Sequence, residues 1–195
     1  MVTENTQTLN DKAWIRWSAL FIVAFTMMAA YYVNDVMAPL KSMLEGQLSW
    51  TSGEFGMFTG AYSFLNVFLL MLIWGGLILD KFGIRFTGIL ATVLMVGGTA
   101  VEYIAITQYG GTSEMLWGYK LDVLMASAGY SVFGVGAEVA GITVTKIIAK
   151  WFKGKEIALA MGVQVALARI GSQAAYAIAI PVAKAYSLET PLFIG

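Results

Sequence analysis

The 195-residue sequence has no cysteine and no histidine, and only 12% of its residues are charged. The chain therefore cannot form disulfides, Cys/His zinc sites, iron–sulfur sites or histidine-based catalytic triads. Its 12 basic and 12 acidic residues leave a formal net charge of zero, so no basic excess predicts nucleic-acid binding. Ordinary soluble proteins carry about 25% charged residues. From these absences we expect no enzymatic activity, no cofactor, no metal and no nucleic-acid partner, and we favour a membrane protein.

Hydrophobic residues make up 58% of the chain and gather in long runs between short clusters of charge. About 20 apolar residues span a bilayer as a helix, in which every backbone polar group finds its partner. The runs do not alternate, which argues against the strands of a membrane barrel. The pattern predicts an all-α membrane protein. We expect membrane-spanning helices over residues 17–37, 55–79, 86–106, 121–149 and 156–180, and a sixth that starts at 190–195 and is cut off.

Lysine and arginine are concentrated in alternate connections, which sets the expected orientation of the chain. One side of the membrane receives Lys12, Arg16, Lys81, Arg85, Lys146, Lys150, Lys153 and Lys155, and the other side Lys41, Lys120 and Lys184. The N-terminal arm, residues 1–16, is therefore expected in the cytoplasm. Residues 17–37 could also be a signal peptide, but the apolar run is long and no small-residue cleavage site follows it, so we interpret it as a retained span.

A motif of glycines and charges follows the second predicted span. Gly76, Asp80, Lys81, Gly83 and Arg85 fit the pattern G-x-x-x-D-[R/K]-x-G-x-[R/K]. This pattern resembles the signature that transporters of the major facilitator superfamily (MFS) carry between their second and third spans. The glycines permit a tight reversal, and a carboxylate at the C-terminal end of a helix requires a cationic partner, for which Lys81 and Arg85 are local candidates. The resemblance implies a gating latch between half-domains; the alternative is an ordinary solvated turn.

Two ionisable residues lie deep inside predicted spans. Glu138 lies roughly 18 Å from the charged 150–156 connection along its helix, and Arg169 roughly 20 Å, at about 1.5 Å per residue. An ionisable group at that depth costs at least a few kcal/mol unless it is paired or hydrated. We predict that Glu138 binds the ammonium and Arg169 the carboxylate of a zwitterionic solute. The alternative is a structural ion pair that only fixes helix packing.

Further polar residues lie at comparable depth or nearby on the same helices. Tyr62 and Asn66 on the second predicted span, and Gln173 and Tyr176 on the fifth, extend the candidate substrate-binding set. Plain helix contacts are the alternative for the first two. Asp35 and Glu138 are candidates for protonation, although a uniporter fits the sequence equally well.

Three longer motifs indicate a closer resemblance. The sequence reads F-G-x-G-x-E at 133–138, W-F-K-G-K-E at 151–156 and A-R-I-G-S at 168–172. These motifs are similar to those of the MFS branch that contains the lysosomal dipeptide transporters. The resemblance implies transport of a di- or tripeptide by alternating access, with residues 17–195 as the N-terminal half-domain and the C-terminal half-domain missing.

The resemblance also implies a multi-pass location in a bacterial inner membrane or a lysosomal or other organelle membrane, with a small solute and lipid as partners. A different MFS substrate, such as another organic anion or a sugar, is the first alternative. A non-transporting membrane scaffold is the second.

Overall fold

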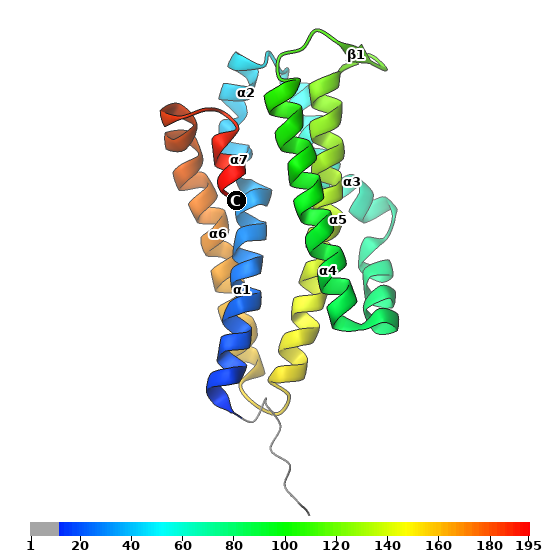
Figure 1. Ribbon diagram of the computed structural model, residues 1–195, viewed down its shortest axis with the longest axis vertical. Coiled ribbons are helices and arrows are strands. Elements are labelled where there is room, and N and C mark those ends of the chain that lie inside the picture. The colour runs from blue at the N-terminus through cyan, green and yellow to red at the C-terminus, as the bar shows by residue number, and fades with distance from the viewer. Residues whose placement is uncertain (1–11) are drawn as a thin grey trace, which may run out of the picture.

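The computed structural model describes residues 12–195, and nearly all of its regular structure is helical (Figure 1). Most of the predicted N-terminal arm, residues 1–11, lies outside the described residues. The elements in chain order are α1 (Ala13–Asp35), the 3-10 turn η2 (Ala38–Leu40), α2 (Lys41–Gln47), α3 (Ser52–Phe68), α4 (Met71–Gln108), β1 (Met115–Leu116), β2 (Tyr119–Lys120), α5 (Leu121–Trp151), α6 (Ile157–Ala185) and α7 (Thr190–Ile194).

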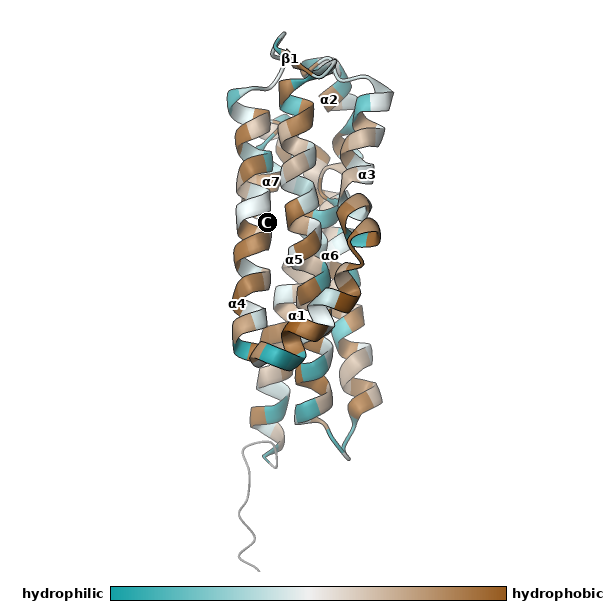
Figure 2. Cartoon of the chain, turned by 90° about the vertical axis from the view of Figure 1, so that its right-hand side faces the viewer, coloured by the Kyte–Doolittle hydropathy of each residue, from teal (hydrophilic) through white to brown (hydrophobic). Residues whose placement is uncertain are grey.

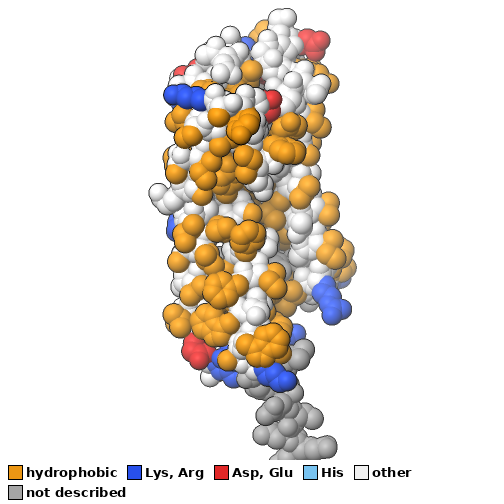
Figure 3. Space-filling model, turned by 60° about the vertical axis from the view of Figure 1, so that its left-hand side comes forward, with side chains coloured by type: hydrophobic (Ala, Val, Ile, Leu, Met, Phe, Trp, Pro, Cys, Tyr) orange, Lys and Arg blue, Asp and Glu red, His pale blue; other side chains and the backbone are white. Residues whose placement is uncertain are grey.

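The described residues contain four helical stretches that are long and apolar enough to cross a bilayer, namely Ala13–Gln47, Met71–Gln108, Leu121–Trp151 and Ile157–Ala185. Large apolar side chains such as Phe25 and Ile89 are exposed along these stretches. Figure 3 shows apolar side chains along the length of one face, with most charged side chains near its two ends, and Figure 2 shows apolar residues along most of each helix. An apolar exterior suits lipid. The helical structure and the apolar exterior agree with the predicted all-α membrane protein.

The second predicted span, residues 55–79, differs from the expected single helix. A capping box starts α3, because the Thr51 hydroxyl accepts a hydrogen bond from the Glu54 amide while the Glu54 carboxylate accepts one from the Thr51 amide. The helix ends at Phe68, and Leu70 takes a left-handed conformation with φ 49°. Every residue from 67 to 73 is apolar, so hydropathy could not reveal this break.

The chain reverses direction within α4 at Gly83, whose φ of 78° leaves the helical region. Before Gly83, the chain approaches α5 at Val139 near Gly75 and at Lys146 near Asp80. Beyond Gly83, its contacts run back along α5, from Thr143 near Gly88 to Phe133 near Gly98. A positive φ of this kind favours glycine, which explains the glycine in the motif.

The helices form two packed groups. In one, α1 packs against α6, and in the other α3 and α4 pack against α5; the groups lie side by side in Figure 1. The backbones of α4 and α5 approach so closely at Gly98 and Gly129 that a Cβ on either glycine would overlap the opposite backbone. Far fewer contacts join α1 to α5, so a seam separates the groups.

Candidate functional site

A polar pocket of about 230 Å³ lies on the seam between the two helix groups. Its lining comes from three helices. Those residues are Met27, Ala30, Tyr31 and Asn34 of α1, Tyr62 of α3, and Ala137, Glu138 and Gly141 of α5. We call this cavity the polar pocket. It gathers a carboxylate, a side-chain amide and two phenols in an otherwise apolar helical bundle, which is the composition expected of a polar solute site.

Glu138 supplies the negative charge of the polar pocket. The hydroxyl of Tyr62 donates a hydrogen bond of 3.2 Å to Glu138 Oε1. The second carboxylate oxygen forms no hydrogen bond within residues 12–195. A half-buried carboxylate with one free oxygen can accept a hydrogen bond from a ligand ammonium, and the Tyr62 contact fixes its orientation.

Arg169 approaches the polar pocket from α6. Its guanidinium carbon lies 5.7 Å from the centre of the Tyr31 ring, close enough for a cation–π interaction. Within residues 12–195, Arg169 and Glu138 form no ion pair. The main partner of α6 is α1 rather than α5. Tyr31 on α1 therefore lies beside both charges, and the guanidinium, on an exposed residue, keeps its hydrogen-bond donors available.

The other predicted substrate-binding residues are only partly brought together. Asn66 donates from Nδ2 to the Tyr62 carbonyl, and its buried Oδ1 has no partner, but it does not line the polar pocket. Gln173 and Tyr176 are exposed on α6 and also lie outside the lining. Asp35 ends α1 and accepts a hydrogen bond of 2.7 Å from Asn34.

The glycine-and-charge motif gains a partner that the sequence did not indicate. Asp80 forms an exposed ion pair of 2.6 Å with Lys146 of α5, not with Lys81 or Arg85. The ammonium of Lys81 lies over the Phe82 ring instead. The carboxylate thus connects the end of the second predicted span to α5. Lys146 lies 66 residues later, too far for local spacing to suggest the pairing. Gly76 has open space where a Cβ would stand.

A second ionic contact joins Arg16, at the start of α1, to Glu156, which lies just before the helical stretch Ile157–Ala185. Arg16 is buried, donates to Glu156 Oε2 at 3.1 Å and lies over the Phe152 ring. A hydrogen bond with its own backbone and then the Arg16 charge lower the pKa of Glu156. Arg16 was expected in the N-terminal arm, and its pairing with Glu156 was not predicted.

Sequence reasoning also missed Tyr31 and Glu102. Tyr31 has no charge and lies in an apolar run, so hydropathy gave no signal. Glu102 did give one, because it is an acid inside the predicted span 86–106. Within residues 12–195, no group of three or more acidic residues is placed to hold a metal ion.

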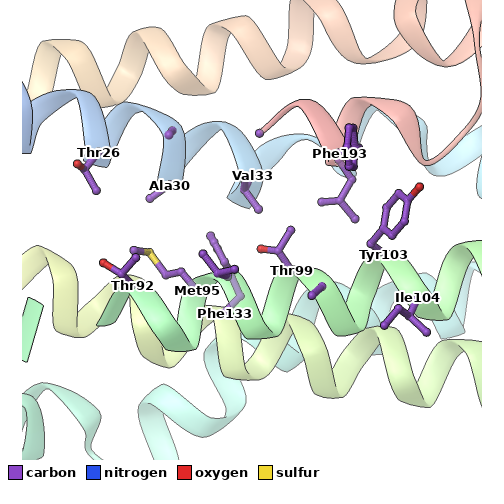
Figure 4. A pocket seen from close by; sticks show the side chains of 15 residues that line it. Thr26, Ala30, Val33, Thr92, Met95, Thr99, Tyr103, Ile104, Phe133 and Phe193 are labelled. Atoms are coloured by element: carbon purple, nitrogen blue, oxygen red, sulfur yellow. The ribbon is translucent and has the colours of Figure 1, made fainter. Parts of the chain in front are cut away.

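A larger cavity of about 510 Å³ lies between α1, α4 and α7 (Figure 4). We call it the apolar pocket. Its polar side chains are all uncharged, namely Thr26, Thr92, Thr99 and Tyr103, and the rest of the lining is apolar. An apolar pocket of this kind cannot neutralise the charges of a zwitterion, so the smaller polar pocket is the better candidate site.

Comparison with known proteins identifies relatives. Those named lysosomal dipeptide transporter MFSD1 from Homo sapiens and Bos taurus are 29% and 30% identical to this chain over 158 residues. The one from Danio rerio is 29% identical over 154 residues. The first two alignments cover 80% of this chain but 31% of the relative, and the third covers 78% and 30%. The chain thus spans about a third of the length of the curated relatives it matches.

No protein-family model and no solved structure matches the chain. The curated relatives nevertheless confirm the resemblance that the motifs indicated. The chain is similar to the lysosomal dipeptide transporters named MFSD1.

Proposed function

We propose that this chain is part of a transporter that carries a small zwitterionic solute, a di- or tripeptide, across a membrane by alternating access. The observation that supports the proposal is the polar pocket, whose lining includes Glu138 and Tyr31, together with the Arg169 guanidinium carbon 5.7 Å from the centre of the Tyr31 ring. The curated relatives, which are named dipeptide transporters, support the substrate class.

The chemistry of the pocket matches the two ends of a peptide. A peptide ammonium would donate to the free oxygen of Glu138, and the peptide carboxylate would accept a pair of hydrogen bonds from Arg169. Tyr62 holds the Glu138 carboxylate by its hydrogen bond, so little ordering remains for the solute to impose. The Asn34 amide, also in the lining, can bond to the peptide linkage.

The small volume of the polar pocket suggests that it is one half of a larger binding site. About 230 Å³ lies below the range of roughly 300–1,000 Å³ that encloses a drug-sized ligand. The relatives are about three times longer than the matched segment. We infer that this chain supplies five spans and the start of a sixth, that its N-terminus is cytoplasmic, and that a C-terminal half-domain closes the site from the other side.

The Asp80–Lys146 contact supports a gating role for the motif. Both side chains are well exposed, so the pair contributes little stability and can be exchanged for another partner. In the proposed cycle, a helix of the C-terminal half-domain competes for Asp80 in one conformation. The membrane is lysosomal or that of another organelle if the source is eukaryotic, and the inner membrane if it is bacterial.

The substitution Arg169→Ala in the full-length protein tests the carboxylate role. Uptake of a labelled dipeptide into proteoliposomes should fall roughly 10- to 100-fold, because charge-assisted hydrogen bonds are lost. A dipeptide amidated at its C-terminus should already be transported poorly by the wild type, and the substitution should then add little further loss.

Lys184→Ala, which removes a cation from the same helix outside the polar pocket, is the matched control and should leave uptake unchanged. Equal losses for the free and the amidated dipeptide in Arg169→Ala would contradict the carboxylate role. Wild-type uptake in that variant would overturn it.

A further inference from the structure

Glu102 is a carboxyl group enclosed between α4 and α5, away from both pockets. Its exposed fraction is 0%, and neither carboxyl oxygen has a hydrogen-bond partner. The two helices approach each other closely here, because a Cβ on Gly129 would lie only 2.7 Å from the Glu102 backbone nitrogen. No protein donor within the described residues therefore compensates the carboxyl group for the solvent it has lost.

The ionisable groups that face Glu102 from the surrounding helices do not neutralise it. On α5, Tyr130 interacts electrostatically with Glu102. Asp122, at the start of the same helix, accepts hydrogen bonds from Trp50 Nε1 and the Gly111 amide. The Tyr130 hydroxyl itself donates to the Asn34 carbonyl at 2.7 Å.

Tyr130 in turn interacts with Asp35 on α1, Tyr62 on α3 and Tyr176 on α6, which are acids and phenols rather than cations. The neighbouring ionisable group on α4, Tyr103, lines the apolar pocket, and α7 has no ionisable residue. Within residues 12–195, no lysine or arginine pairs with Glu102.

An ionised carboxylate in these surroundings would lack solvent, hydrogen bonds and a counter-charge. Each of these losses disfavours the charged form far more than the neutral acid. A carboxyl group buried in this way keeps its proton unless the structure around it opens. The packing of α4 on α5 and the protonation of Glu102 are therefore linked, and whatever separates the helices also permits ionisation.

We propose that Glu102 is a proton-binding site that holds its proton while α4 and α5 are packed together. It releases the proton in a conformation that admits water between these helices. On release the O–H bond breaks, its electron pair stays on the carboxylate, and the proton passes to water. Because the two conformations differ in proton affinity, acidity favours the packed one.

Tyr130 connects this site to the polar pocket, since its hydroxyl bonds to Asn34, which lines that pocket. Proton release at Glu102 thus changes the charge near Tyr130, which contacts the lining of the polar pocket through Asn34. The link to transport rests on the proposed function, whereas the protonation of Glu102 does not.

Infrared difference spectroscopy of the full-length protein in lipid nanodiscs tests the protonation directly. At neutral pH, the wild type should show the carbonyl stretch of a protonated carboxylic acid, and this band should be absent in Glu102→Gln. Glu138→Gln, which removes the pocket carboxylate, is the matched control and should keep the band. Identical spectra for the wild type and Glu102→Gln would overturn the proposal.

Glu102→Gln mimics the neutral acid, so the variant should insert and unfold at the wild-type temperature or above it. If it does not insert, Glu102→Asp, which keeps a carboxyl group, should shift the band, and an unshifted band would overturn the proposal. If neither the wild type nor the variants transport dipeptides, the proposed function fails, while the infrared band still decides the protonation of Glu102.

The pH profile of dipeptide uptake tests the link to transport. A pH-dependent step in the wild type should be lost in Glu102→Gln and kept in Glu114→Gln, which changes an exposed acid. An unchanged profile in Glu102→Gln would exclude the coupling of this proton to transport.

Discussion

The polar pocket and the apolar pocket both lie along helix α1 and share Ala30, but they differ in size and chemistry. The apolar pocket is about 510 Å³ and uncharged, and the polar pocket is about 230 Å³ and contains Glu138. Of these two cavities, only the smaller one therefore offers a charge to a solute. For a charged solute, a few placed polar groups are a better guide to a candidate site than size is, because burying an unpaired charge is costly.

The substitution Glu138→Gln should produce the largest difference between the pockets. It keeps the shape of the side chain but removes the charge that would bind a ligand ammonium. The Michaelis constant for a labelled dipeptide in the full-length protein should rise roughly 10- to 100-fold. An N-acetylated dipeptide, which has no ammonium, serves as the control. Its Michaelis constant should differ little between the wild type and Glu138→Gln. An unchanged Michaelis constant would remove the polar pocket from substrate binding.

Tyr62→Phe should have a smaller effect, because it removes one hydrogen bond to Glu138 and leaves the charge. The loss of one ordinary hydrogen bond predicts a change of roughly 2- to 10-fold in the same constant. Tyr103→Phe makes the identical change in the apolar pocket and should leave dipeptide uptake unchanged. Equal effects of the two substitutions would remove the distinction between the pockets.

Thr99→Val tests whether a solute enters the apolar pocket at all. The two side chains have nearly the same shape, so the change removes a hydroxyl and little else. We expect less than about a twofold change in uptake, since a single hydroxyl that binds no substrate carries no binding energy. A loss as large as that of Tyr62→Phe would place the substrate in the apolar pocket.

The smallest effect is expected far from both pockets, at the contact between Arg16 and Glu156. The pKa of Glu156 is lowered in the folded protein, so this contact stabilises the fold above the unfolded pKa of Glu156. The stabilisation is lost as the pH falls through the folded value. On acidification over that window, the unfolding temperature of the wild type should fall slightly more than that of Glu156→Gln. Parallel curves would show that the contact adds no stability.

The sequence predicted most of the fold, because long apolar runs leave a membrane protein few options. The ends of the helices and the interruption at Leu70 were not predictable from hydropathy, because left-handed backbone at an apolar residue changes no composition. The reversal at Gly83 agrees with the expected tight turn, since a glycine marks the place where φ becomes positive.

The candidate site was predictable in part. Residues that are conspicuous in an apolar run, such as Glu138 and Arg169, could be selected because charge inside a membrane is rare. The position of Arg169 beside Tyr31 depends on α6 packing against α1, a long-range contact that local periodicity does not contain. The pairing of Asp80 with Lys146 is long-range in the same sense.

The packing of α1 against α6 also has a consequence for biosynthesis. The partner of α1 begins at Ile157, 122 residues after α1 ends at Asp35 (157 − 35). At about 5–20 residues per second, a ribosome needs roughly 6–24 s to make that interval. During this time the first helix stays in the bilayer or the insertion machinery without its main neighbour, and Arg16 has no Glu156. The group of α3, α4 and α5 is made within that interval and can assemble first.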